Sequence, residues 1–240
     1  MNPFYIGGII GFAPALFLIW FSLRKYSYPY VEGSLFEDRK VFFMLAVGMV
    51  VGTVISTFEM FLLPYSKIDY TMFILVYVIG FVLLEDLAKF VILNFKGYQG
   101  RFDSTFYGLS LGAGYSATHM IGLVIREMAF SESLGLVNWL GIIVLSVSMA
   151  LIHCSVGATL GNATGRNLGL RGLIPALIPH FVFQMLMYPG FFYSQMWYAL
   201  IFVLPLSVIV FHGVYNHTIP ESLPPEVQKE MRRKSRRRTR

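Results

Sequence analysis

Three charged residues lie close together within one long apolar stretch of the sequence. Glu85, Asp86 and Lys89 occur in the segment LLEDLAKF, and each costs roughly 2.5 to 3.5 kcal/mol at the centre of a membrane helix. A helix places Glu85 and Lys89 on one face, where they can pair, while Asp86 points about 100° away. Ionisable residues inside a membrane are by default candidates for function. The alternatives are a structural salt bridge and a helix end in the cytoplasm.

Histidines occur in three other apolar stretches, beside residues that favour close helix packing. One helix face consists of Gly108, Gly112, Tyr115 and His119. A similar face in the next stretch consists of Ser146, Met149, His153, Gly157 and Gly161. The last stretch places Gln184 four residues after His180, on the same face. Glycines on such faces let a neighbouring helix approach closely, so the histidines should point into a packed interior.

The elements that must hold these residues are membrane helices. The chain has 240 residues, of which 56% are hydrophobic and 13% charged, whereas a soluble domain has about 25% charged residues. The sequence therefore predicts an all-α, polytopic membrane bundle, with residues 1–225 as one transmembrane domain and 226–240 as a basic tail. A span needs about 20 apolar residues. Seven spans are predicted: Pro3 to Leu23, Val41 to Leu63, Thr71 to Phe95, Ser104 to Ile125, Leu136 to Ala163, Leu173 to Tyr188 and Gln195 to Tyr215.

The basic residues of the predicted loops sort to one side of the membrane. That side carries Arg24, Lys25, Arg39, Lys40, Lys96, Arg101, Arg166, Arg171 and the tail from Lys229 to Arg240. The other side carries Lys67 and Arg126. The positive-inside rule then predicts a multi-pass protein of the cell membrane with its N-terminus outside and its C-terminus in the cytoplasm. The tail should touch anionic lipid; a nucleic-acid arm is the alternative, but no stretch suggests a nucleic-acid-binding fold.

The ionisable and imidazole groups lie at similar depths in these predicted spans. Glu85, His153 and His180 lie about nine or ten residues from the cytoplasmic boundary and His119 about fifteen, or ~13 to 22 Å into the membrane. We therefore expect four helices to contribute to one hydrated cavity. A glutamate there can act as a general base, and neutral imidazoles can bind a metal, hold water or donate to an oxyanion. Such a set is suited to peptide hydrolysis within the membrane.

In this order the motifs resemble those of the PrsW-type intramembrane proteases and of the superfamily that contains the CAAX prenyl proteases. The stretch from Glu85 to Lys89 is similar to the family motif Glu-Glu-x-x-Lys, with Asp86 in place of the second Glu. The stretch from Asp103 to Tyr115 looks like the PrsW motif Asp-Gly-x-x-Tyr-Gly-x-x-x-Gly-x-Gly-Phe. PrsW relatives then have Glu-Asn, where this chain has His119-Met120. Tyr115-x-x-x-His119 is instead similar to the Phe-x-x-x-His motif of the CAAX branch.

Two further motifs extend this resemblance to about 100 residues, from Leu83 to Gln184. His153 with CSVGATLG resembles the PrsW histidine helix, and His180-x-x-x-Gln184 resembles the His-x-x-x-Asn/Asp motif of the CAAX branch. The resemblance implies a helical bundle with an intramembrane protease site. It implies the catalytic set Glu85, Asp86, His119, His180 and Gln184, supported by Lys89, Tyr115 and His153. Glu85 would activate water, His119 would hold that water or a metal, and His180 with Gln184 would orient the substrate or stabilise the oxyanion.

The sequence leaves the cofactor and the function class open. His119, His153 and His180 could supply three zinc ligands with water in the fourth position, so zinc is a hypothesis beside a metal-free site. The expected substrate is a membrane-anchored or lipidated protein. One alternative is a proton- or ion-coupled transporter, because Glu and His residues across helices also form proton relays. Another is a noncatalytic scaffold or substrate-binding relative, which the departures at Asp86, Met120 and Gln184 motivate.

Overall fold

A computed structural model describes residues 2–28, 30, 31, 33–62, 71–130, 135–192 and 199–238. These residues form helices and no strands, which confirms the all-α prediction. The long helices are α1 (Pro3–Leu23), α2 (Asp38–Leu62), α3 (Thr71–Leu93), α4 (Ser104–Phe130), α5 (Leu136–Gly165), α6 (Ile174–Phe192) and α7 (Ala199–Gly213). Two short helices, α8 (Ile219–Ser222) and α9 (Pro225–Arg238), follow a π-helical turn at Val214–Thr218.

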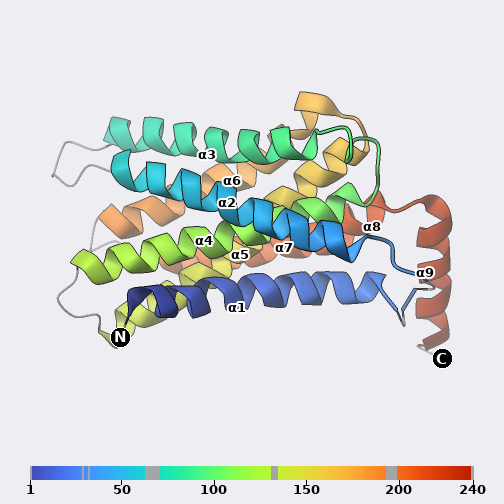
Figure 1. The fold of residues 1–240 in the computed structure, drawn as a ribbon, viewed down its shortest axis with the longest axis horizontal. Helices are drawn as coiled ribbons and strands as arrows, with labels where there is room; N and C mark the ends of the chain where they lie inside the picture. The colour runs from blue at the N-terminus through green and yellow to red at the C-terminus, as the bar shows by residue number, and fades with distance from the viewer. Residues whose placement is uncertain are drawn as a thin grey trace.

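Within the described ranges, six stretches of helix are long and apolar enough to cross a membrane. They are Pro3–Tyr26, Asp38–Glu59, Ser104–Ala129, Leu136–Gly165, Gly169–Met187 and Ile201–Ser222. The chain is thus a multi-pass membrane protein by length and composition. The remaining long helix, α3, contains Glu85, Asp86 and Lys89 and lies beside α2 and α6 (Figure 1).

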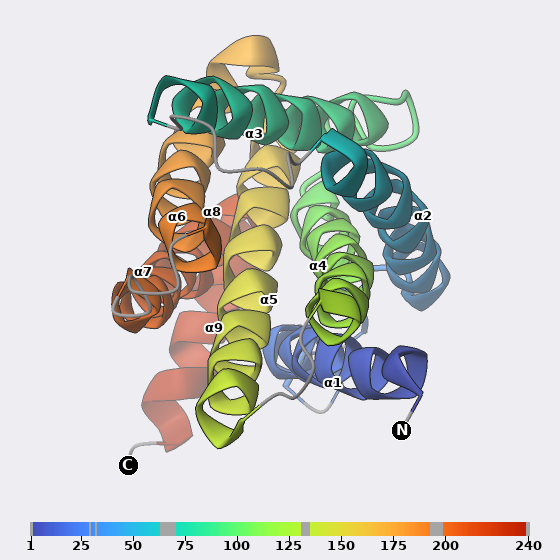
Figure 2. The same cartoon turned by 90° about the vertical axis from the view of Figure 1, so that its left-hand side faces the viewer.

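Helices α4 and α5 pack against each other at the centre of the bundle. Helices α1 and α2 pack on α4, while α6 and α7 pack on α5. Helix α3 crosses above α4 and α5 and packs on α6, as the end-on view shows (Figure 2). This arrangement brings the charged residues of α3 next to the histidines of the central helices.

The predicted glycine faces explain how closely α4 and α5 approach. A Cβ on Gly108 would overlap the backbone of Gly157, and a Cβ on Gly161 would overlap the backbone of Ser104. A Cβ on Gly112 would overlap the carbonyl group of His153. Only residues without a side chain permit this backbone contact, as the small-residue pattern predicted. The contact fixes His153 of α5 against the face of α4.

Several helix ends differ from their predicted positions. Helix α2 begins at Asp38 instead of Val41, and α4 continues past Ile125 to Phe130. The predicted spans end at the first charged residues, whereas the backbone hydrogen bonds of a helix continue through such residues. In addition, an acidic residue such as Asp38 stabilises the first turn of a helix. The ends predicted at Leu63 and Gln195 lie outside the described residues.

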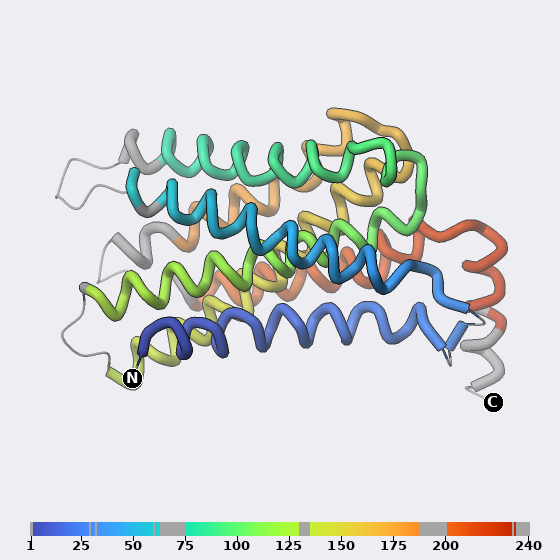
Figure 3. The backbone as a smooth tube through the Cα atoms, in the orientation of Figure 1, coloured from blue at the N-terminus to red at the C-terminus, as the bar shows by residue number. Residues whose placement is uncertain are grey.

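Successive long helices run in opposite directions along the bundle (Figure 3). The C-terminal end of α1, the N-terminal end of α2 and the tail helix α9 share one end, and α9 runs across it (Figure 1). Val227 and Met231 of α9 pack against the bundle, while Lys229 and Arg233 are exposed. The basic tail therefore forms a helix that rests on the end of the bundle.

Candidate functional site

Three ionisable side chains of α3 are buried inside the bundle. Glu85, Asp86 and Lys89 each have an exposed fraction of 0%. They occupy the face of α3 that meets α5 and α6, as their partners His153 and His180 show. Because these charged groups are fully buried, their energy depends on the groups around them.

Lys89 binds two acceptors on different helices. Its ammonium group donates to Asp86 Oδ1 at 3.1 Å and lies 3.2 Å from His153 Nδ1. Glu85 Oε2 is farther away, at 3.8 Å. The predicted ion pair between Glu85 and Lys89 is therefore present, but Asp86 makes the shorter contact with Lys89. A helix offers the i,i+3 and i,i+4 positions at similar distances, and contacts from α6 decide between them.

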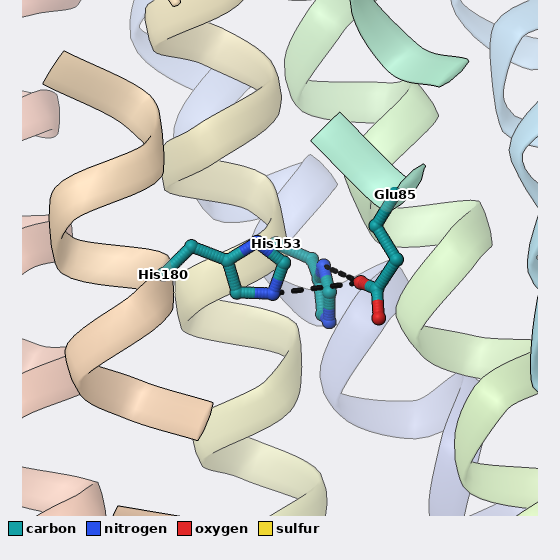
Figure 4. A group of neighbouring side chains, drawn as sticks. All are labelled: Glu85, His153 and His180. Carbon is teal, nitrogen blue, oxygen red and sulfur yellow. Dashed lines mark ion pairs between the residues drawn. The ribbon is translucent and has the colours of Figure 1, made fainter. Parts of the chain in front are cut away.

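The contact from α6 is made by His180. Its Nδ1 lies 2.9 Å from Asp86 Oδ1, and since a carboxylate only accepts, this ring nitrogen carries the hydrogen. Its Nε2 then lies 3.5 Å from Glu85 Oε2 (Figure 4). A carboxylate that orients a histidine in this way is common beside metal and acid–base sites, because it fixes the tautomer and raises the basicity of the ring.

His153 of α5 has the opposite tautomer. An ammonium group has no acceptor, so the contact between Lys89 and His153 Nδ1 requires a lone pair on that nitrogen and a hydrogen on Nε2. Glu85 points between His153 and His180, with its Oε2 3.8 Å from His153 Nδ1 (Figure 4). The two rings meet edge to face, with their centroids 4.8 Å apart. Glu85 thus lies between two imidazoles whose orientations are set by different partners.

A third acidic residue, Glu59 of α2, joins the site through His119 of α4. Its Oε2 lies 3.4 Å from His119 Nε2, and both side chains are buried. Glu59 was not among the predicted site residues, although it lies within the predicted span Val41 to Leu63. The signal that identified Glu85, an acid inside a span, would have found Glu59 as well.

Two groups of side chains bring ligand atoms close enough to hold a metal ion. The first is Glu85, His153 and His180, and the second is Glu59, Glu85 and His119, with atoms within 4.8 Å of one another in each group. Glu85 belongs to both. The predicted set of three histidines is not brought together as one group among the described residues: His119 lies with the carboxylates, and its ring centroid is 6.3 Å from that of His153.

Several buried polar atoms of this cluster have no hydrogen-bond partner among the described residues. They are both carboxylate oxygens of Glu85, Asp86 Oδ2, Tyr115 OH, His119 Nδ1, His153 Nε2 and Gln184 Oε1. Each such atom costs roughly 1 to 3 kcal/mol when it is buried and unpaired. So many in one place favour the binding of a polar ligand, such as water, a peptide group or a cation. Gln184 Nε2 lies 3.5 Å from His180 Nε2, at the edge of the cluster.

With all three of its carboxyl groups ionised, the cluster carries more negative than positive charge. Three carboxylates, Glu59, Glu85 and Asp86, face one ammonium group, that of Lys89. Two carboxylates at most 4.8 Å apart, as in Glu59 and Glu85, repel each other by roughly 3 kcal/mol at an effective dielectric constant of about 20. Bound cations or protons would relieve this repulsion.

Another acidic residue of the predicted motifs, Asp103, lies outside the cluster and anchors the start of α4. It accepts hydrogen bonds from Arg101 Nε at 3.0 Å, from Arg101 Nη2 at 2.6 Å and from Tyr107 OH at 2.9 Å. Burial opposes ionisation, but the hydrogen bonds from Arg101 and Tyr107 outweigh it and hold the pKa of Asp103 below its ordinary value. Asp103 and Tyr107 therefore stabilise the helix that carries His119.

Comparison with known proteins does not assign the chain to a family. Neither the family models, nor the curated proteins, nor the solved structures yield a match. The resemblance to the PrsW and CAAX proteases thus stays a prediction, and the functional argument depends on the geometry of the cluster.

Proposed function

We propose that this protein is an intramembrane endopeptidase of the cell membrane that hydrolyses a peptide bond of a membrane-anchored or lipidated protein. The observation that carries this proposal is the position of the fully buried Glu85 between imidazoles of two other helices. Within the described part of the chain, neither of its carboxylate oxygens has a hydrogen-bond partner. Hydrolysis inside a membrane needs a base that can take a proton from water in a dry environment, and Glu85 supplies one.

The neighbouring groups have the positions that such a reaction requires. Glu85 takes a proton from water as the oxygen attacks the peptide carbonyl, and the proton then passes to the leaving nitrogen. His180, held by Asp86, presents Nε2 to Glu85 Oε2 at 3.5 Å, next to the proposed base. The free amide oxygen of Gln184 accepts from a substrate N–H, and its amide nitrogen donates to the developing oxyanion.

The proposed topology has seven spans, which are the six stretches given above and α3. At 23 residues, α3 is about 35 Å long, enough to cross the hydrocarbon layer. Its charges face the interior, whereas its exposed face carries Val76, Ile79, Leu83, Leu84, Leu87 and Val91. Such a face suits lipid. The N-terminus is then outside, and the basic helix α9 lies on the cytoplasmic surface, where Lys229 and Arg233 contact anionic lipid.

The test is cleavage by the full-length protein in liposomes, with a panel of fluorescent single-span peptides as substrates. Glu85→Gln keeps the size of the side chain but removes the base, so cleavage should fall by about 10² to 10⁴-fold. Glu127→Gln, a change near the far end of α4, serves as the matched control and should cleave normally. Equal thermal stability of both variants would show that folding is intact. Full activity of Glu85→Gln in such liposomes would remove the proposed base.

A further inference from the structure

The two groups that meet at Glu85 differ in whether their ligand atoms are already engaged. In the first group, His153 Nδ1 lies 3.2 Å from the ammonium of Lys89, so its lone pair is already used by a cation. In the second group, Nε2 of His119 lies 3.4 Å from Glu59 Oε2, and no described residue forms a hydrogen bond with either oxygen of Glu85. Lys89 lies 3.8 Å from Glu85 Oε2 but makes its shorter contacts to Asp86 and His153, so the second group can accept a cation at lone pairs that the lysine does not use.

The charged groups also divide into a neutral pair and an excess of negative charge. Asp86 and Lys89 form a contact of 3.1 Å and neutralise each other. Glu59 and Glu85 remain, with exposed fractions of 4% and 0% and a combined charge of −2 when ionised. One divalent cation between them would balance this charge inside a low-dielectric interior.

We propose that Glu59, Glu85 and His119 bind one zinc ion, and that Lys89 keeps His153 out of its coordination. Two carboxylates and one imidazole are zinc ligands, and three protein ligands leave a fourth position for water, as in catalytic zinc sites. The contact of 3.4 Å between Glu59 Oε2 and His119 Nε2 shows that helices α2 and α4 already hold two of the donors together. This inference deepens the proposed function, on which its catalytic meaning rests, because the proposed base, Glu85, would itself be one of the three zinc ligands.

Zinc binding is measured directly and without a substrate. Full-length protein in nanodiscs is dialysed against buffers of fixed free zinc, and the bound zinc per chain is determined by mass spectrometry. The wild type should bind one zinc ion. The variants Glu59→Gln and His119→Gln should each bind zinc at least about 100-fold more weakly. Loss of a residue that only supports a metal ligand already weakens metal binding by up to about 100-fold, so loss of a ligand itself should cost at least as much. His212→Gln, a change at an exposed histidine of α7, should bind as the wild type does.

His153→Gln discriminates between the two groups. Loss of zinc from this variant, with zinc retained by Glu59→Gln, would place the ion in the first group and overturn the proposal, as would the absence of bound zinc from the wild type. X-ray absorption at the zinc edge provides a measurement that needs no variant. One imidazole with oxygen ligands supports the proposal, and two or three imidazoles contradict it.

The outcomes for zinc and for cleavage are independent. A wild type that cleaves peptides and loses activity in Glu85→Gln, but binds no zinc, would preserve the hydrolase and refute the metal site. A wild type that binds zinc through Glu59 and His119, but cleaves none of the peptides, would preserve the metal site and refute the hydrolase.

Discussion

Replacing Gly112 with alanine should force α4 and α5 apart at the level of the site. A Cβ at this position would lie 2.5 Å from the carbonyl carbon of His153 and 3.0 Å from the amide nitrogen of Cys154. Ordinary contact begins at 3.4 Å, so the backbone of α5 must retreat by at least about 0.9 Å. Because a helix backbone yields less readily than the tip of a side chain, we expect a loss of about 2 to 3 kcal/mol in the free energy of unfolding.

The same substitution should impair cleavage more than stability alone explains. The displaced carbonyl belongs to His153, whose Nδ1 contacts Lys89 and faces Glu85. A shift of about 1 Å in a catalytic arrangement can lower the rate by about 10²-fold. Folded Gly112→Ala protein should therefore bind a peptide substrate but cleave it slowly.

The measurements are reversible unfolding in mixed detergent micelles and cleavage in liposomes at a temperature where the variant stays folded. Gly80→Ala in α3 is the matched control, because a Cβ there meets nothing within 4 Å. Alanine favours a helix over glycine by up to about 1 kcal/mol, so this control should be neutral or slightly stabilising. If Gly112→Ala proved as stable and as active as Gly80→Ala, the reasoning about backbone contact between α4 and α5 would be refuted.

Two further predictions concern the charged groups. Lys89→Met should lower the free energy of unfolding by about 3 to 5 kcal/mol, because it leaves Asp86 buried without its ion-pair partner. The double variant Lys89→Met, Asp86→Asn should recover part of that loss. An unchanged midpoint of detergent-induced unfolding in the single variant would contradict this prediction. Arg101→Gln should cost about 1 kcal/mol near pH 7, since the arginine is partly exposed. The lowered pKa of Asp103 stabilises the fold above the unfolded value of about 3.9 and ceases to do so as the pH falls through the folded value, so unfolding curves of wild type and variant should converge in acid.

Part of the site could be predicted because its signals are local. Glu85, Asp86, His119, His153 and His180 stand out as polar residues in apolar stretches, and the depth of each follows from counting along a helix. Their burial in one bundle agrees with that prediction. Glu59 could have been found by the same rule.

The pairing of these groups depends on how the helices rotate and cross, which local sequence does not specify. A turn of one residue moves a side chain by about 100°, so the choice of Lys89 between Glu85 and Asp86 required the position of α6 and its His180. The division of the imidazoles into two groups also followed from packing, since α2 brings Glu59 to His119.

The sequence alone determined that this is a helical membrane protein with ionisable residues in its interior, because apolar length and composition are sufficient to identify spans. Only the tertiary structure decided which groups share Glu85, which ring nitrogens carry hydrogens and which ligand atoms remain free. The physical reason is that these properties arise from contacts between helices, whose geometry is set by the backbone approach at residues such as Gly112 and Gly157.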